Sequence, residues 1–220
     1  VKASDLLVRC LEAEGIRYVF GVPGEENADV MMSLEASDIR FVLCRHEQGA
    51  AFMAEVHGRL TGEPAGALGT LGPGATNLLT GVADANMDRS PMIVLTGQGA
   101  TTRLHKESHQ VMDVVAMYEP ITKWAQSVHH AGNIPEIVRK AVRIAKTEKP
   151  GACLIELPED IADHDVDAEP IMPHRFRRPV PDDKIVDQAW AAIQAAERPI
   201  ILAGNGTIRR RASTQLRQFV

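Results

Sequence analysis

Short apolar runs alternate with segments of helical periodicity through the first 157 residues. The runs lie at 16–20, 39–43, 65–70, 91–96 and 151–157. Apolar residues recur at helical spacing at 4–14, around 30–34, and at 47–60, 75–86 and 134–145. This alternation predicts an α/β fold with a parallel sheet and helices on both faces. The run PMIVLT at 91–96 is apolar throughout, which predicts a central strand covered on both sides.

Between the fourth and fifth runs the pattern is less regular. Residues 100–113 are polar and aperiodic, which predicts a loop. After them we expect a helical turn at 114–118 and a short extended piece at 120–124.

A change in composition divides the chain. Residues 166–182 are rich in proline and charge and have little periodicity, which predicts a linker. Beyond it we expect a helix near 185–193, a strand at 199–203 and a basic helix at 208–219. One helix–strand–helix unit cannot close a hydrophobic core. We therefore predict a domain at 1–165, the linker, and at 183–220 the truncated start of a second α/β domain of a longer protein.

Charge and cysteine content narrow the class of protein. The formal net charge of −5 gives no general attraction to nucleic acid, and the apolar runs are too short to span a membrane. Cys10, Cys44 and Cys153 lie far apart in apolar stretches, which predicts buried, reduced thiols. We expect a cytoplasmic protein without a nucleic-acid or membrane partner. The histidines lack the spacing of a ligand set, so no metal site is expected within this chain.

Three glycine-containing turns follow predicted strands: GVPGEEN at 21–27, GPGATN at 72–77 and GNG at 204–206. None has the residues of a P-loop or a G-x-G-x-x-G motif, and each alone is typical of a tight strand-to-helix turn. Glu47 stands where the run 39–43 turns into a small-residue helix. Ligands of open α/β sheets bind at the carboxyl ends of strands. The residues thus predict a cofactor cleft with Glu47 as the acid–base carboxylate, although the helix dipole could also stabilise a glutamate there.

Six blocks, in order, carry a resemblance to a known family: GVPGEEN, RHEQGAAFMAE, GRLTGEPA, GTLGPGATNLLTG, ANMDRSPMIVLTGQ and EKPGACLIELPED. Over residues 1–165 the chain resembles the pyrimidine-binding domain of thiamine diphosphate enzymes, and among them the acetolactate synthase group. Residues 183–220 resemble the start of that family's central domain.

The resemblance implies two catalytic residues. Glu47 matches the glutamate that hydrogen-bonds N1′ of the cofactor's aminopyrimidine and so favours the tautomer whose 4′ nitrogen takes the C2 proton. That bond requires Glu47 to hold or share a proton. Gln110 matches a glutamine that reaches into the active site.

The same resemblance assigns five cofactor-binding residues besides Glu47. Pro23 and Gly24 would line the pyrimidine pocket, and Thr70, Pro73 and Asn77 would flank it. Turn and helix-cap structure explains these residue types equally well.

The resemblance also implies partners outside these motifs. In this family the diphosphate and Mg²⁺ are held by a separate domain with a Gly-Asp-Gly motif, and this chain has none. The small faces of the helices at 47–60 and 75–86 would form the contact of a homodimer or tetramer, or would simply pack within the domain. The segment at 105–118 is similar to catabolic acetolactate synthases without FAD, so FAD is possible but not indicated.

The expected reaction is that of an acetolactate synthase-like carboligase, which decarboxylates pyruvate and joins it to a second 2-keto acid. A role in branched-chain amino acid biosynthesis follows from that group, and a catabolic role stays open. Pyruvate oxidase, benzoylformate-type decarboxylase and oxalyl-CoA decarboxylase are alternatives. Glyoxylate carboligase is disfavoured because it lacks the glutamate that Glu47 supplies. A non-catalytic nucleotide-binding or oligomerisation module is the alternative of another class.

Overall fold

The computed structural model describes residues 1–173, 180–209 and 212–220. The chain divides into two compact units, Val1–Pro173 and His174–Val220, and each is described by itself. In the described parts of the chain, no helix combines the length and the apolar content that crossing a bilayer demands.

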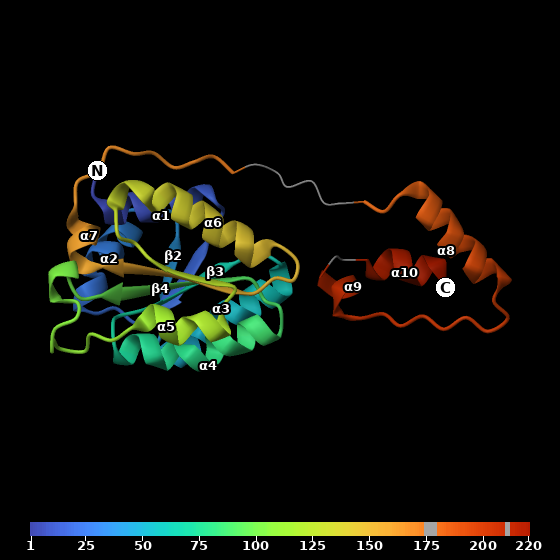
Figure 1. The fold of residues 1–220 in the computed structure, drawn as a ribbon, viewed down its shortest axis with the longest axis horizontal. Helices are drawn as coiled ribbons and strands as arrows, with labels where there is room; N and C mark the ends of the chain where they lie inside the picture. The colour runs from blue at the N-terminus through green and yellow to red at the C-terminus, as the bar shows by residue number, and fades with distance from the viewer. Residues whose placement is uncertain (174–179, 210–211) are drawn as a thin grey trace. The chain divides into compact units, whose positions relative to one another are not determined.

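The first unit is built on a six-stranded parallel sheet with the order β2-β1-β3-β4-β6-β5 (Figure 1). The strands are β1 Tyr18–Gly21, β2 Arg40–Leu43, β3 Ala65–Gly69, β4 Met92–Gln98, β5 Trp124–Ser127 and β6 Ala152–Pro158. The predicted α/β class is confirmed. The run at 91–96 forms β4, whose neighbours β3 and β6 cover both of its edges.

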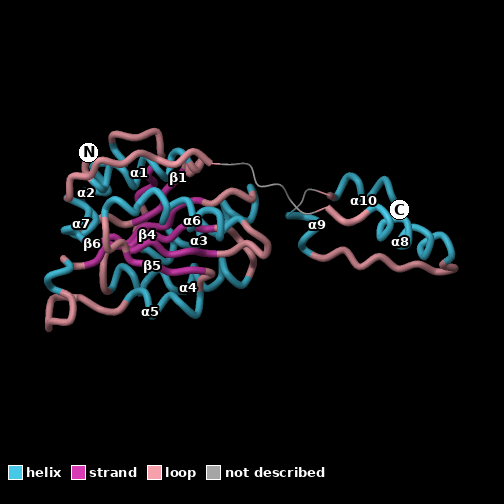
Figure 2. Tube along the Cα trace, turned by 45° about the horizontal axis from the view of Figure 1, so that its top comes forward, coloured by secondary structure: helices cyan, strands magenta, loops and turns pink. Residues whose placement is uncertain are grey.

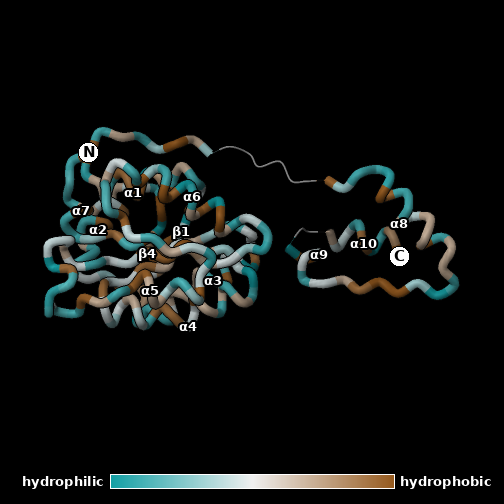
Figure 3. Tube along the Cα trace, in the orientation of Figure 1, coloured by the Kyte–Doolittle hydropathy of each residue, from teal (hydrophilic) through white to brown (hydrophobic). Residues whose placement is uncertain are grey.

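Helices cover both faces of this sheet (Figure 2). The helices of the unit are α1 Ala3–Ala13, α2 Ala28–Glu35, α3 Glu47–Thr61, α4 Pro73–Met87, α5 Val114–Tyr118, α6 Ile134–Lys146 and α7 Glu159–Asp163. Side chains of β4 alternate between the two layers: Ile93 and Leu95 join the cluster under α1 and α6, whereas Met92 and Val94 join the cluster under α3 and α4. In Figure 3 the apolar colour accordingly gathers between the helix layers.

The extended piece expected at 120–124 is wrong in position. Residues Glu119–Ile121 form a 3₁₀ turn, and the strand β5 begins at Trp124. Its sequence, WAQS, carries no apolar run because β5 is an edge strand and is only partly buried. Pairing with β6 decides this strand, and local pattern does not reveal it.

Part of the predicted linker packs on the first unit. Val166 and Val1 exchange backbone hydrogen bonds, with the amide of Val166 donating to Val1 at 2.9 Å. Arg9 forms an ion pair with Glu169, and Arg139 Nη1 donates to the carbonyl of Met172 at 2.6 Å. Residues 174–179 of the predicted linker lie outside the described residues.

The second unit contains α8 Asp183–Ala195, α9 Asn205–Arg209 and α10 Ser213–Phe219. The helix expected near 185–193 is present as α8, whereas the expected helix 208–219 is divided between α9 and α10, with 210–211 outside the described residues. The strand expected at 199–203 is wrong: that segment has no regular structure, and Leu202 is 96% exposed. A strand needs a neighbour to pair with, and the described residues of this unit offer none.

Candidate functional site

Three of the predicted motifs meet at one edge of the sheet because β2, β1 and β3 are neighbours. The turn at 21–27 follows β1, Glu47 begins α3 four residues after β2 ends, and the turn at 70–72 follows β3. All three strands are parallel, so their carboxyl ends lie side by side. The topology thus gathers residues that are up to 53 positions apart, from Gly24 to Asn77.

Glu47 is the first residue of α3, and the preceding His46 caps the helix by accepting a hydrogen bond from the amide of Gln48 at 3.1 Å. The carboxylate is half-buried. Asn77 Nδ2, from α4, donates to Glu47 Oε2 at 3.0 Å. Among the described residues, none donates a hydrogen bond to the second oxygen, Oε1. One carboxylate oxygen is therefore fixed by Asn77, and the other accepts no hydrogen bond from the described residues.

Two glycines beside this carboxylate pack closely on Thr70. A Cβ built on Gly74 would lie 2.5 Å from Thr70 Oγ1 and 3.5 Å from Glu47 Oε1. A Cβ built on Gly24 would lie 2.1 Å from Thr70 Cγ2. Glycine is needed at both positions because any side chain would collide with Thr70. Gly24, Glu47, Thr70 and Asn77, all predicted as site residues, are therefore brought together with Gly74.

The two predicted prolines occupy exposed positions at the same edge. Pro23 lies in the turn after β1, and Pro73 is the first residue of α4, where a missing N–H costs nothing. Asn27, which the sequence did not single out, orders the first of these turns. Its Oδ1 accepts from the amide of Gly24 at 2.9 Å, and the residue is buried. Asn27 is the last residue of the GVPGEEN motif, so the motif could have pointed to it.

Gln110 lies in the loop that follows β4 and has a positive φ of 55°. Gln110 is exposed, and its backbone packs on Gly72, the N-cap of α4. A Cβ built on Gly72 would lie 2.8 Å from both Cβ and the carbonyl oxygen of Gln110. The loop thus brings Gln110 to the start of the helix that also carries Gly74 and Asn77.

The small face of α3 packs inside the unit, so its expected role as a contact between subunits is wrong. Ala50, Ala51 and Ala54 are fully buried, and a Cβ on Gly81 of α4 would lie 2.6 Å from Ala51 Cβ. The small residues let α3 and α4 approach closely, and this holds Glu47 and Asn77 within hydrogen-bond distance. The opposite face of α3 is apolar and exposed, with the residues Phe52, Met53, Val56 and Leu60.

The remaining titratable groups of interest in the described residues are one carboxylate cluster and the three cysteines. In the described residues, one carboxylate cluster has a spacing that could hold a metal ion, namely Glu55, Asp84 and Asp88. The guanidinium of Arg59 forms ion pairs with all three. The three cysteines are buried and free, and burial raises the pKa of the Cys10 and Cys153 thiols to about 12. Burial also raises the pKa of Cys44, the cysteine nearest to Glu47 in sequence.

Comparison with known proteins agrees with this geometry. The profile described as "Thiamine pyrophosphate enzyme, N-terminal TPP binding domain" matches residues 1–117. A catabolic acetolactate synthase of Raoultella terrigena is 42% identical over 91% of this chain and 36% of its own length. A probable acetolactate synthase large subunit of Methanocaldococcus jannaschii is 39% identical over 98% of the chain and 38% of its own length.

A glyoxylate carboligase of Escherichia coli O157:H7 is also similar, at 35% identity over 100% of this chain and 38% of its own length. The chain thus spans little more than a third of the curated relatives it matches. The residues at the carboxyl ends of β1, β2 and β3 lie within the matched segment, as does Gln110. The chain belongs to the thiamine pyrophosphate enzymes, whose N-terminal TPP-binding domain it carries.

Proposed function

We propose that this chain is the N-terminal part of an acetolactate synthase-like carboligase, which decarboxylates pyruvate and joins the product to a second 2-keto acid. The observation that carries the proposal is the Glu47 carboxylate. Asn77 holds Oε2 at 3.0 Å, and Oε1 lies on the side of Gly74, 3.5 Å from where a Cβ of that residue would stand. An aminopyrimidine ring offers a flat face and a ring nitrogen that such a carboxyl group can bond.

The residues present fit thiamine diphosphate, the same compound as thiamine pyrophosphate. Gly24 and Gly74 let the two turns pack closely on Thr70 beside Glu47, because a side chain at either position would strike Thr70. Pro23 and Pro73 are rigid and exposed at the same edge. Pro23, Gly24, Thr70, Pro73 and Asn77 would hold the pyrimidine, and Glu47 would bond its N1′. When bound, this cofactor stabilises the carbanion that forms on decarboxylation of a 2-keto acid.

The work of the chain's own residues is to hold one proton in place. Glu47 Oε1 would share the proton of the bond to N1′, and the hydrogen bond from Asn77 to Oε2 keeps the carboxyl group from rotating away. Glu47 is the first residue of α3, so its backbone position is set by the start of that helix. Gln110 is exposed beside Gly72 and would contact the substrate. Mg²⁺ and the diphosphate would be held by residues outside this chain, and FAD is not required by any residue named above.

We further propose a homodimer or tetramer that forms through the exposed apolar face of α3. Phe52, Met53, Val56 and Leu60 fall within one arc of the helix, and their exposed fractions run from 37% to 76%. An uninterrupted apolar face of this kind marks an association surface. In sedimentation velocity, Met53→Glu is expected to yield monomers, whereas Met32→Glu, on exposed α2, leaves association unchanged. Equal effects of the two substitutions would refute this interface.

Other members of the family are alternatives because the relatives include a glyoxylate carboligase at 35% identity. Pyruvate oxidase, benzoylformate-type decarboxylase and oxalyl-CoA decarboxylase are the alternatives within the family. A biosynthetic and a catabolic role are both compatible with the relatives. We propose a cytoplasmic location and a 2-keto acid as the small-molecule partner.

The test is made in the complete enzyme that contains this chain. Exchange of the cofactor's C2 proton for deuterium, followed by NMR, is expected to slow by more than a hundredfold in Glu47→Gln, on the scale of lost acid–base catalysis. Glu63→Gln is the matched control, because Glu63 lies just beyond the other end of α3 and is exposed. Unchanged exchange in Glu47→Gln would refute the role of Glu47. The 220-residue chain alone is expected not to turn over pyruvate.

A further inference from the structure

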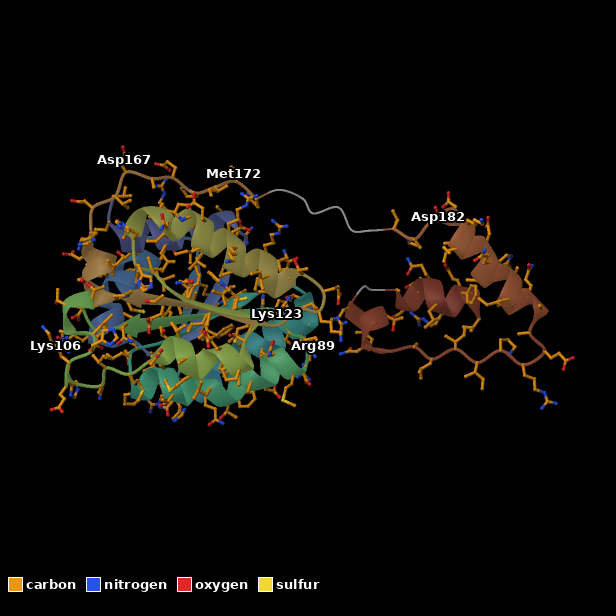
Figure 4. The ribbon with its side chains drawn as sticks, in the orientation of Figure 1. Arg89, Lys106, Lys123, Asp167, Met172 and Asp182 are labelled. Atoms are coloured by element: carbon orange, nitrogen blue, oxygen red, sulfur yellow. The ribbon has the colours of Figure 1, made fainter. Side chains whose placement is uncertain are left out.

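The loop between β4 and α5, residues 99–113, carries Gln110 and is tied down along its length. Figure 4 shows Lys106 at the outer edge of the first unit. The two ends of the loop contact polar side chains that stand at the carboxyl end of β4 and at the start of α7. None of these side chains belongs to the predicted site.

The first half of the loop is held by α7. Glu159 Oε1 accepts from the amide of Ala100 and from Arg103 Nη1, each at 3.0 Å. Asp160 accepts from the amide of Thr101 at 2.9 Å and from its hydroxyl at 2.5 Å. Burial alone would raise the pKa of Asp160, but these bonds outweigh it and the pKa is lowered. The first two residues of α7 therefore fix the 3₁₀ turn Thr101–Arg103.

The second half is held by the sheet. Gln98 Nε2 donates to the carbonyl of Met112 at 3.0 Å and to Glu156 Oε1 at 2.9 Å. Gln98 Oε1 accepts from the amide of Gly99 at 2.9 Å. Gln98 and Glu156 are both buried, so their pairing is protected from water. The side chain of Gln98 thus bonds both the first residue of the loop, Gly99, and a residue near its end, Met112.

A single chain of contacts leads from α7 to Ser108. Arg103 binds Glu159 through Nη1 and donates through Nε to Ser108 Oγ at 2.9 Å. Ser108 stands two residues before Gln110, whose backbone is packed on Gly72. A guanidinium is suited to this task because its planar fork can serve two acceptors at once.

We propose that Glu159 is a positioning residue: through Arg103 and Ser108 it holds the loop in the conformation that presents Gln110 at the start of α4. The consequence for catalysis rests on the role of Gln110 in the proposed function. The positioning itself is a property of the chain without cofactor, and it is measured there.

The experiment compares four variants of the 220-residue chain by ¹⁵N relaxation and amide hydrogen exchange. In the wild type the Gln110 amide is expected to have an order parameter of about 0.85, as in rigid backbone. In Glu159→Ala it is expected to fall below about 0.6, and the exchange of the Ala100 amide to accelerate at least tenfold. Glu159→Gln keeps an acceptor oxygen and is expected to restore most of the order at Gln110.

Two further variants keep the proposal open to refutation. Asp163→Ala removes an ion pair with Lys2 from the other end of the same helix, and is expected to leave Gln110 ordered. Ser108→Ala cuts the contact to Arg103 without touching α7, and is expected to loosen Gln110 even if Glu159→Ala fails to fold. The proposal is overturned if Gln110 stays ordered in Ser108→Ala and Glu159→Ala, or if Asp163→Ala loosens it equally.

The failures of the two proposals are distinguishable. If Gln110 loosens as expected but the complete enzyme carrying Glu159→Ala turns over substrate with unchanged kcat and KM, the role of Gln110 in the proposed function is wrong. If Gln110 stays ordered, the positioning is wrong whatever the enzyme does.

Discussion

The contact between Gly24 and Thr70 gives a prediction whose magnitude follows from two distances. A Cβ on Gly24 would lie 2.1 Å from Thr70 Cγ2, whereas the next nearest atoms, Thr70 Cβ and Oγ1, are at 3.4 and 3.8 Å. The backbone of Gly24 is extended, with φ −160° and ψ −175°, a conformation open to any residue. The cost of Gly24→Ala is therefore steric and comes from one methyl group.

We expect Gly24→Ala to lower the free energy of unfolding by about 1–3 kcal/mol, the usual cost of overpacking. In a Thr70→Ala background that methyl group is absent, and the same substitution meets only ordinary contacts. There it is expected to be neutral or to stabilise by about 0.5 kcal/mol, because alanine restricts the unfolded chain more than glycine does. The double-mutant cycle should thus give a coupling of about 1–3 kcal/mol.

The assay is urea unfolding followed by the fluorescence of Trp124, in chains that carry Trp190→Phe so that the second unit contributes no signal. The midpoint and the slope are compared for the four members of the cycle. Equal destabilisation by Gly24→Ala with and without Thr70 would refute the reasoning, since the collision would then lie elsewhere.

Three other outcomes follow from buried groups. Glu55→Ala should destabilise the protein by about 2 kcal/mol in urea unfolding, less than the roughly 3–5 kcal/mol of a fully buried pair because the side chain of Arg59 is 47% exposed. Asp88→Asn, at the exposed end of the cluster, should lower the free energy of unfolding by about 0.5 kcal/mol. Equal losses from the two substitutions would contradict this ranking. Burial raises the pKa of Glu156 above its ordinary 4.5, although hydrogen bonds from Ser127 and Gln98 oppose this. The contribution of Glu156 to stability is therefore present below pH 4.5 and is lost as pH rises through the raised pKa. In urea titrations, the stability of Glu156→Gln relative to wild type should increase from about pH 4.5 to about pH 8. A pH-independent difference would contradict this prediction. At pH 8 a thiol reagent should label the native chain slowly and label all three cysteines in urea, because burial keeps the thiols protonated; rapid native labelling would show exposed thiols.

Much of the geometry of the candidate site could be predicted because its residues stand in short local motifs. Glu47, Gly24 and Thr70 each follow a strand that can be predicted from an apolar run in the sequence. Parallel strands bring the positions that follow them together. Asn27, Gln98 and Glu156 were missed although they lie within the matched blocks. Their function is to bond backbone or one another across the fold, and a polar residue at a strand end does not reveal its partner. The small face of α3 was misassigned because close packing within a domain and between subunits needs the same residue types.

The sequence by itself determined the alternating fold, the location of Glu47 at a strand-to-helix junction and the family, because these depend on periodicity and on residues adjacent in the chain. Only the tertiary structure decided which oxygen of Glu47 is held, by a residue 30 positions away, and which face of α3 is exposed. It also decided that 199–203 forms no strand and that Glu159 reaches the loop of Gln110. Hydrogen-bond partners and packed faces are relations between distant segments, and their geometry exists only once the sheet has assembled.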